Sequence, residues 1–252
     1  MLSEQALVRV LERVGADAPV RFDEVTGSTN ATARSMAADG APEWTLVAAA
    51  HQTAGRGRLG RSWHDVPGRA LMFSLVLRPG IAADRGGLIT LLAGAAMARA
   101  CGAIAGAEVR CKWPNDLLDR SGRKVGGILA ESAVADGRFD HVVLGVGVNL
   151  GRGPADVPGS AGVPAEPEPL LAAFAETFAV DYEPTSARFD RRVLDRYRPL
   201  CETLGLAVRA TTIDGQVIEG EAVDLDPTGA LLIRTEGRVE VVRSGEVEHL
   251  AT

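Results

Sequence analysis

The last fifty or so residues of the chain are built differently from those before them. After Leu204 the sequence holds four short runs rich in β-branched residues, at 206–212, 216–225, 230–234 and 239–243. Three turn signals separate these runs: Asp214-Gly215, Asp-Pro-Thr-Gly at 226–229, and Glu236-Gly237. Short strands joined by hairpin turns predict a small barrel. We therefore expect two domains, 1–204 and 205–252.

The longer first part mixes helices and strands without a regular order. Helical periodicity predicts helices at 2–14, 30–38, 86–101, 170–178 and 193–200. Apolar and β-branched runs predict strands at 21–25, 45–50, 71–77, 108–112, 124–135 and 141–148. The stretch 151–169 is rich in Pro and Gly and predicts a loop. Because helices and strands do not alternate strictly, we expect an α+β fold.

Composition limits the class of protein. The chain has 252 residues and is 46% hydrophobic, enough for a sizeable core. It has no uninterrupted run of about 18 apolar residues and no signal-peptide pattern, so we expect neither a membrane span nor a secreted protein. The three cysteines lack C-x-x-C spacing, and the four histidines lack metal-ligand spacing. With a net charge of −6, these features predict a cytoplasmic enzyme without a protein-bound metal.

The most unusual segment for function is 52–64, Gln-Thr-Ala-Gly-Arg-Gly-Arg-Leu-Gly-Arg-Ser-Trp-His. Its three arginines alternate with three glycines: Arg56, Arg58 and Arg61 with Gly55, Gly57 and Gly60. Glycine lets a backbone approach a ligand closely, and the arginine fork matches phosphate or carboxylate. This segment is therefore predicted to close over a small anion.

Three other interpretations of this segment compete with that one. Its glycines formally spell the dinucleotide fingerprint G-x-G-x-x-G, which needs a helix directly afterwards. Instead Pro67 and Gly68 follow, and the next strand ends in Arg78 where an acidic ribose ligand is needed. An RNA-binding loop is disfavoured by the acidic net charge and by Trp63 being its only aromatic residue. A solvated loop without function stays open at this point.

Four further motifs lie between residues 26 and 149. They are Thr-Gly-Ser-Thr-Asn at 26–30, Cys-Lys-Trp-Pro-Asn-Asp-Leu at 111–117, Arg-Lys-Val-Gly-Gly-Ile-Leu-Ala-Glu at 123–131 and Gly-Val-Gly-Val-Asn at 145–149. Each has an ordinary structural interpretation: a helix cap, a proline turn, a solvated lysine at a strand start, and a bulged strand end. Each also brings polar groups or bare backbone to an element end, where ligands bind.

Taken together and in this order, the five motifs resemble those of the biotin protein ligase family, from Ser28 through Asn149. The resemblance implies a mixed-sheet catalytic domain of the class II synthetase-like type, followed by an SH3-like barrel. It also implies the reaction. Biotin and MgATP give biotinyl-5′-AMP and pyrophosphate, and the biotinyl group then passes to a lysine of a biotin carboxyl carrier protein.

The same resemblance assigns residues to roles. The catalytic candidates are Lys124, Arg58 and Asp116. The expected biotin-binding residues are Ser28, Thr29, Asn30, Gln52, Gly55, Arg56, Gly57, Arg58, Trp63, Lys124, Gly126 and Gly127. The expected ATP- and adenylate-binding residues are Arg56, Arg58, Arg61, Trp63, Lys112, Asn115, Lys124 and Asn149. Fixed cations suit this chemistry because two anions, a carboxylate and a phosphate, must meet.

Two alternatives remain open from the residues alone. A lipoate–protein ligase shares the fold and the chemistry, and a non-catalytic binding module for a small molecule or nucleic acid would need neither. Bifunctional members of the family carry a winged-helix domain before the Gly-Ser-Thr-Asn motif. Because 27 residues precede Ser28, we expect a ligase without repressor function, a carrier protein as partner, and no DNA or membrane partner.

Overall fold

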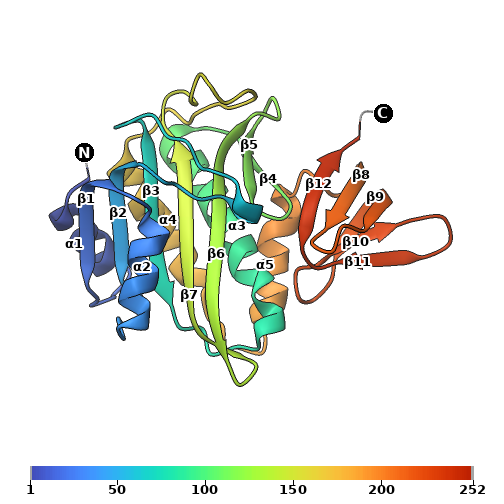
Figure 1. Cartoon of the computed structure of the whole chain (residues 1–252), viewed down its shortest axis with the longest axis horizontal. Coiled ribbons are helices and arrows are strands. Elements are labelled where there is room, and N and C mark those ends of the chain that lie inside the picture. The colour runs from blue at the N-terminus through green and yellow to red at the C-terminus, as the bar shows by residue number, and fades with distance from the viewer. Residues whose placement is uncertain (1, 251–252) are drawn as a thin grey trace.

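The computed structural model describes residues 2–250 and contains two β-sheets side by side (Figure 1). The helices are α1 Glu4–Arg13, α2 Thr29–Ala38, α3 Gly87–Ala105, α4 Pro167–Asp181 and α5 Phe189–Tyr197, with 3-10 turns η1 Arg58–Gly60, η2 Ala83–Arg85 and η3 Arg198–Leu200. The strands of the first sheet are β1 Val20–Thr26, β2 Leu46–Gln52, β3 Ala70–Leu77, β4 Val109–Lys112, β5 Asp116–Asp119, β6 Lys124–Ala135 and β7 Arg138–Asn149. Those of the second are β8 Ala207–Thr212, β9 Val217–Leu225, β10 Leu231–Arg234, β11 Val239–Val242 and β12 Gly245–His249.

The first sheet is mixed, which confirms the predicted α+β class. Its strand order is β1-β2-β3-β7-β6-β5-β4, with β1 and β2 parallel and every other neighbouring pair antiparallel. The main core fills one face of this sheet, where α3 and α4 pack. On the other face α2 packs its alanines, Ala33 and Ala37, against Val47, Val76 and Val143. Because these side chains are small, α2 packs close to the sheet, and its N-terminus lies near the strands.

Helix α3 bears on the expectation that the chain has no membrane span. The segment Ala83–Ala105 is long and apolar enough on average to pass a length-and-composition test for a membrane span. It does not stand out as an unbroken apolar run because a few polar residues interrupt it. However, 67% of its most apolar window is buried inside the protein. The helix packs against α4, α5 and the sheet, so its apolar surface is explained by the core.

The second sheet has five strands in the order β11-β10-β9-β8-β12. The sequence predicted four of these strands and missed β12, just as it missed β5 in the first sheet. Both are short and carry charged residues: β5 reads Asp-Leu-Leu-Asp and β12 reads Gly-Glu-Val-Glu-His. Pairing with neighbours, rather than local propensity, makes them strands.

The two sheets are joined by specific contacts around Trp113. Its indole Nε1–H donates to the Gly229 carbonyl at 3.0 Å, and its backbone N–H donates to Thr203 Oγ1 at 3.0 Å. Arg198 pairs with Asp224 of the second sheet at 2.7 Å. Trp113 lies in the β4–β5 turn, which also holds Asn115 and leads into Asp116 of β5, so the second sheet and these two predicted site residues are positioned together.

The three cysteines, Cys101, Cys111 and Cys201, are buried and free. Burial raises the pKa of all three thiols. A buried thiol with a raised pKa is a poor nucleophile, so these residues act as small apolar groups in the core.

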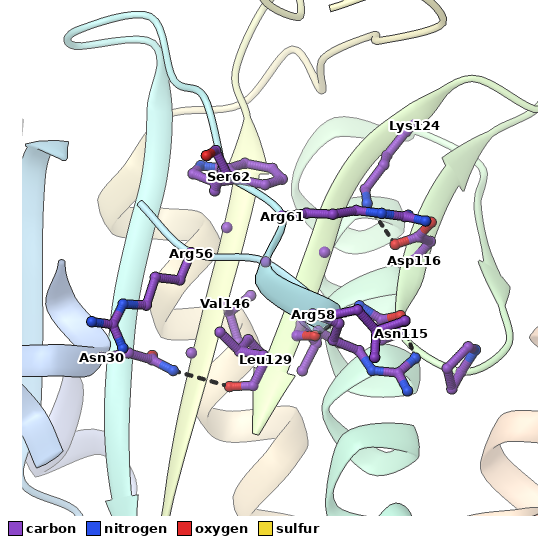
Figure 2. Close-up of a pocket in the computed structure, with 18 of the residues that line it drawn as sticks. Asn30, Arg56, Arg58, Arg61, Ser62, Asn115, Asp116, Lys124, Leu129 and Val146 are labelled. Carbon is purple, nitrogen blue, oxygen red and sulfur yellow. Dashed lines mark hydrogen bonds and ion pairs between the residues drawn. The ribbon is translucent and has the colours of Figure 1, made fainter. Parts of the chain in front are cut away.

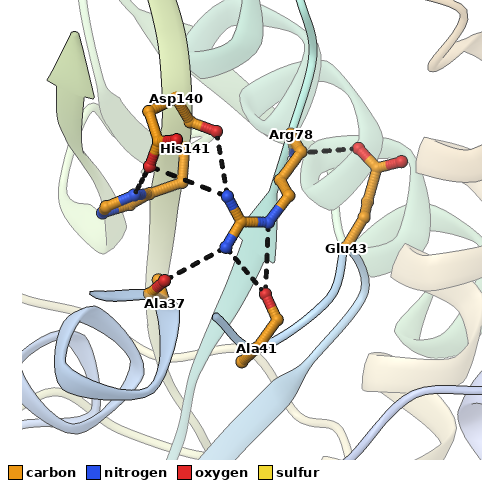
Figure 3. A network of polar contacts seen from close by, with 6 residues as sticks. All are labelled: Ala37, Ala41, Glu43, Arg78, Asp140 and His141. Atoms are coloured by element: carbon orange, nitrogen blue, oxygen red, sulfur yellow. Dashed lines mark hydrogen bonds and ion pairs between the residues drawn. The ribbon is translucent and has the colours of Figure 1, made fainter. Parts of the chain in front are cut away.

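Arg78 closes the C-terminal end of α2 (Figure 3). Its guanidinium donates to the carbonyls of Ala37 at 3.0 Å and Ala41 at 2.9 Å, which belong to the end of that helix and the turn after it. The side chain that argued against a dinucleotide site thus caps a helix. No α-helix follows the glycine-rich segment directly within the described residues; the 3-10 turn Arg58–Gly60 lies inside it instead.

His249 gives the joint between the domains a pH dependence. Its Nε2 lies 3.2 Å from Thr203 Oγ1, and burial, followed by the nearby Lys112 charge, lowers its pKa from the ordinary 6.5. The unfolded chain therefore binds this proton more readily, so the stabilisation is present above pH 6.5 and is lost as the pH falls through the lowered pKa. We expect the melting temperature of the parent protein to fall about 2 °C further than that of His249→Gln between pH 7.5 and 5. Parallel melting curves across this range would contradict the assignment.

Candidate functional site

The structure has a cleft of about 190 Å³ on the α2 face of the first sheet. The backbone of strands β6 and β7 forms its floor. Successive residues of a strand point to opposite faces, so Val143, Gly145 and Gly147 of β7 share one face. Register pairs Gly147 with Gly127 of β6 and Gly145 with Leu129. Val143 packs under α2, whereas the glycines beyond it let Asn30 and Trp63 lie directly against the strand backbone. The groove is therefore a consequence of which strand positions lack a side chain.

The glycine- and arginine-rich segment forms a hairpin that crosses this groove (Figure 2). Gly57 N–H donates to the Arg61 carbonyl at 2.7 Å, and Trp63 N–H donates to the Gly55 carbonyl at 3.0 Å. A Cβ on Gly55 would lie 2.6 Å from the Trp63 carbonyl oxygen, so only glycine allows the two limbs to approach so closely. Below, the Trp63 ring rests on Gly147, where a Cβ would come within 2.8 Å of it.

Two of the hairpin arginines are held by the C-terminal domain. Arg58 donates to Asn115 Oδ1 at 3.3 Å, to Ser244 Oγ at 3.1 Å and to the Gly245 carbonyl at 3.3 Å. Arg61 forms an ion pair with Glu246. Burial lowers the pKa of Arg58, although the Asp116 carboxylate opposes this effect. The hairpin is therefore clamped between the β4–β5 turn and the start of β12.

Lys124 stands at the first position of β6, opposite the hairpin. Its Nζ lies 2.6 Å from Asp116 Oδ1, with side-chain exposures of 41% and 27%, so the ammonium is paired yet open to the cleft. Its backbone is held on both sides: Lys124 N–H donates to the Gly159 carbonyl, and its carbonyl accepts from Ala161 N–H, each at 2.8 Å. An anion entering the cleft would meet a fixed cation whose partner it can replace.

The far end of the cleft, at the N-terminus of α2, is lined by hydroxyl and amide groups. Ser28 is the N-cap residue by position, but its side chain makes no capping bond. Gln52 Oε1 accepts from Thr29 N–H at 2.7 Å instead. Asn30 donates to Glu131 Oε2 at 2.8 Å and accepts from the Ser74 hydroxyl at 2.6 Å. Hydroxyl and amide groups are thus held in fixed orientations beneath the hairpin.

Most of the predicted site residues line this one cleft. They are Ser28, Thr29, Asn30, Gln52, Arg56, Gly57, Arg58, Arg61, Trp63, Lys112, Asn115, Asp116, Lys124 and Gly127. The structure thus brings together residues that lie up to 99 positions apart, from 28 to 127, in a single cavity.

Three of the predicted residues, Gly55, Gly126 and Asn149, do not line the cleft. Gly126 is on the opposite face of β6 from Gly127, where a Cβ would lie 2.7 Å from the Gly147 carbonyl. Gly55 packs against Trp63 within the hairpin, as described above. Asn149 is 4% exposed and donates to the Ala161 carbonyl at 2.9 Å, so its amide holds the loop that fixes Lys124.

The sequence patterns did not reveal every residue that shapes the site. Ser74 is fully buried in the otherwise apolar strand Ala-Leu-Met-Phe-Ser-Leu-Val-Leu, and that isolated hydroxyl was a usable signal. Glu131 closes one of the motifs but was given no role. Ser244 and Glu246 lie in the C-terminal domain, and no local pattern connects them with the hairpin.

Gly145 offers a direct test of the groove. A Cβ there would lie 2.0 Å from Asn30 Oδ1. We expect Gly145→Ala to lower the free energy of unfolding by about 1–3 kcal/mol and to weaken ligand binding at the α2 end more than about tenfold. Gly27→Ala is the matched control, because a Cβ on Gly27 meets no atom within 4 Å. Chemical denaturation and calorimetric titration measure both effects, and equal behaviour of the two variants would contradict this view of the floor.

Comparison with known proteins identifies relatives over nearly the whole chain. The model of the biotin/lipoate A/B protein ligase family matches residues 22–149, and that of the biotin protein ligase C-terminal domain matches 203–250. The biotin–[acetyl-CoA-carboxylase] ligase of Mycobacterium tuberculosis is 36% identical over 244 residues, covering 89% of this chain and 86% of the relative. The bifunctional ligase/repressor BirA of Bacillus subtilis is 32% identical over 238 residues, covering 90% and 73%.

Solved structures show the same fold. The biotin protein ligase of Aquifex aeolicus, solved in complex with biotin and ATP, superposes with a TM-score of 0.72. It is 22% identical and covers 92% of this chain and 99% of that one. The biotin protein ligase of Leishmania major in complex with biotinyl-5-AMP gives a TM-score of 0.62 at 24% identity, covering 94% of this chain and 100% of that one.

Proposed function

Because the chain belongs to the biotin/lipoate A/B protein ligase family, we propose that it is an ATP-dependent biotin–[biotin carboxyl-carrier protein] ligase (EC 6.3.4.15). One observation of the site carries this proposal furthest. An arginine hairpin and Lys124 face one groove whose other end presents hydroxyl and amide groups. Among ligases of this family, biotin is favoured over lipoate by the match of residues 203–250 to the biotin protein ligase C-terminal domain.

The reaction has two steps. A biotin carboxylate oxygen attacks the α-phosphorus of MgATP, forming the acyl–phosphate bond of biotinyl-5′-AMP and releasing pyrophosphate. The neutral amine of a carrier lysine then attacks the acyl carbon, forming an amide, releasing AMP and losing one proton. Mg²⁺ enters as part of the nucleotide substrate and screens its phosphates.

We assign Lys124 to the carboxylate and α-phosphate. Its ammonium is paired with Asp116 in the structure and is part-exposed in the cleft, which supports this role. Arg58 and Arg61 of the hairpin supply the remaining positive charge toward the phosphates, with Lys112 and Asn115 on the β4–β5 side. Preorganised cations stabilise the charge that develops as two anions combine.

We assign Asp116 to the second step. When the biotin carboxylate and the nucleotide take over Lys124, the Asp116 carboxylate becomes free to accept a hydrogen bond from the incoming lysine. A lysine amine has an ordinary pKa of about 10.4, so it must lose a proton before it can attack. A carboxylate beside the reacting centre orients the ammonium and helps to take up that proton.

The polar end of the groove suits the biotin head. A ureido ring is uncharged and carries both donors and acceptors, which match the hydroxyls of Ser28 and Thr29 and the amides at Asn30 and Gln52. We assign Trp63 to the apolar tail, because its ring covers the bare backbone at Gly147 between the two ends. The hairpin above the groove, with Arg56, keeps water from the reactive anhydride.

The partners follow from the reaction. We propose a biotin carboxyl carrier protein as acceptor and biotin and ATP as small-molecule substrates. With a net charge of −6 we propose no DNA partner, since DNA binding is mainly electrostatic. The cytoplasm, which keeps buried thiols reduced, is the proposed compartment.

The experiment that tests the proposal is pyrophosphate exchange into ATP with one acid added at a time. We expect exchange with biotin and a rate at least about 100-fold lower with lipoate. Added carrier protein should then become biotinylated at one lysine, as intact mass shows. Exchange with lipoate alone would favour the lipoate ligase, and no exchange with either would favour a binding module.

A further inference from the structure

Outside the arginine hairpin and Lys124, the structure holds a buried charge without an assigned role: Asp65. Its side chain is fully buried, at 0% exposure, although it lies on the exposed stretch that leads out of the hairpin. Asp65 Oδ2 lies 2.9 Å from His51 Nδ1, and Asp65 Oδ1 accepts from Gln52 N–H at 3.2 Å. Burying a carboxylate is costly unless it is paired and hydrogen-bonded. The two contacts of Asp65 meet this requirement, and they also hold His51 and Gln52 in place.

The two partners of Asp65 stand at the opposite root of the hairpin. His51 and Gln52 end strand β2, and the hairpin begins a few residues later. One carboxylate thus ties the strand that enters the hairpin to the chain that leaves it. The span between Gln52 and Asp65 is closed by a side chain, in addition to the backbone bond between Gly55 and Trp63.

The effect reaches the polar end of the cleft through Gln52. With its backbone held by Asp65, Gln52 directs Oε1 to Thr29, accepting from Thr29 N–H at 2.7 Å and from Thr29 Oγ1 at 3.2 Å. A helix N-terminus needs such an acceptor. Because Gln52 supplies it from another strand, the Ser28 hydroxyl is not used as the cap and stays available in the cleft.

We propose that Asp65 is a positioning residue of the biotin site. Through His51 and Gln52 it holds the N-terminus of α2 and the root of the hairpin in the geometry that leaves the Ser28 hydroxyl free for ligand. The inference rests on the proposed function for the identity of the ligand. The brace, meaning the contacts of Asp65 with His51 and Gln52, does not depend on that function.

The test compares three variants of the full chain by calorimetric titration with biotin in the absence of ATP. We expect Asp65→Ala to raise the biotin Kd about tenfold. Asp65→Asn should recover most of the affinity, to within about threefold, because an amide can accept from Gln52 N–H and donate to the unprotonated Nδ1 of His51. The matched control is Asp156→Asn, since Asp156 pairs with His64 nearby but is 75% exposed; we expect no change in Kd.

Two further readouts separate a positioning role from a merely structural one. In pyrophosphate exchange, Asp65→Ala should raise KM for biotin and leave kcat within about threefold, whereas a smaller folded fraction would lower kcat and leave KM unchanged. Hydrogen exchange at the Gln52 amide should be at least about tenfold faster in Asp65→Ala than in Asp156→Asn. If Asp65→Ala does not fold, His51→Ala replaces it, with an expected rise in Kd of about threefold.

The possible failures are distinguishable. If folded Asp65→Ala binds biotin as tightly as the parent protein, the positioning role is wrong. If the parent protein does not bind biotin at all, the proposed function is wrong, and exchange at Gln52 still decides whether the brace exists. Unchanged protection of Gln52 in Asp65→Ala would overturn the brace whatever the ligand.

Discussion

Lys124→Ala should abolish formation of biotinyl-5′-AMP, lowering the rate of pyrophosphate exchange at least about 1000-fold. The ammonium is the cation at the start of β6 that faces the hairpin across the groove, and its partner Asp116 is left unpaired in the variant. Without it, the carboxylate and the α-phosphate repel each other and the Asp116 charge adds to the repulsion. The measurement is exchange of labelled pyrophosphate at saturating biotin and ATP.

The neighbouring Arg123 provides the control. Its side chain is 58% exposed and pairs with Asp119 on the outside of the β5–β6 hairpin, away from the cleft. Arg123→Ala removes one positive charge from the adjacent position, and we expect exchange within about twofold of the parent protein. If Lys124→Ala lost no more activity than Arg123→Ala, the assignment of Lys124 would be wrong. Circular dichroism and thermal melting verify that both variants are folded.

Arg58→Gly should release biotinyl-5′-AMP about 100-fold faster than the parent protein. Arg58 joins the hairpin to two other parts of the site, because it donates to Asn115 on the β4–β5 turn and to Ser244 and Gly245 at the start of β12. Hydrogen bonds from a charged donor contribute about 1.5–3 kcal/mol each, so losing this clamp leaves the hairpin held by its own backbone bonds and by Arg61. The hairpin then opens and the adenylate escapes before transfer.

Release is measured by forming the adenylate from labelled ATP, removing free nucleotide, and trapping the product that leaves the enzyme. Leaked adenylate should also biotinylate lysines of a bystander protein. Arg120→Gly, at an 87% exposed arginine outside the cleft, is the control and should release at the parent rate. Retention of the adenylate by Arg58→Gly would show that the hairpin does not act as a lid.

The Arg61–Glu246 ion pair is a second, weaker attachment of the hairpin to β12. Arg61 forms an ion pair with Glu246, so phosphates entering the cleft must compete with this carboxylate for the same guanidinium. At 60% and 41% exposure this pair is screened by water and adds little to stability, so exchanging its partner costs little. Arg58, half-buried and bonded to neutral groups, is the firmer attachment. The C-terminal domain thus holds the hairpin by one strong and one replaceable contact.

Much of the fold could be predicted from the sequence because the local pattern of apolar residues indicates which segments are buried. The run at 71–77 is entirely buried, and α3 is apolar over most of its length because it packs against α4, α5 and the sheet. Strands β5 and β12 could not be predicted in the same way. Both strands are short, charged and compatible with turns, and only the neighbouring strands supply the hydrogen bonds that make them extended.

The candidate site, too, has features that the sequence could predict and features that it could not. Its motifs are contiguous in sequence, so the arginines, Lys124 and the Ser-Thr-Asn segment could be recognised from the sequence alone. Which of the two glycines lies on the cleft face could not be predicted, because strand alternation puts Gly127 on that face and Gly126 in the core, and the register with β7 sets this choice. The same applies to Asn149, whose amide is occupied by Ala161 rather than directed into the cleft.

By itself the sequence determined which chemical groups are present: a segment of glycine and arginine, one lysine at a strand start, and hydroxyls at a helix start. Only the tertiary structure decided what holds these groups. Arg58 meets Ser244 across 186 residues, and Gln52 caps a helix that begins 23 residues before it. Such contacts depend on sheet register and on how two domains dock, and neither is encoded in the periodicity of any single segment.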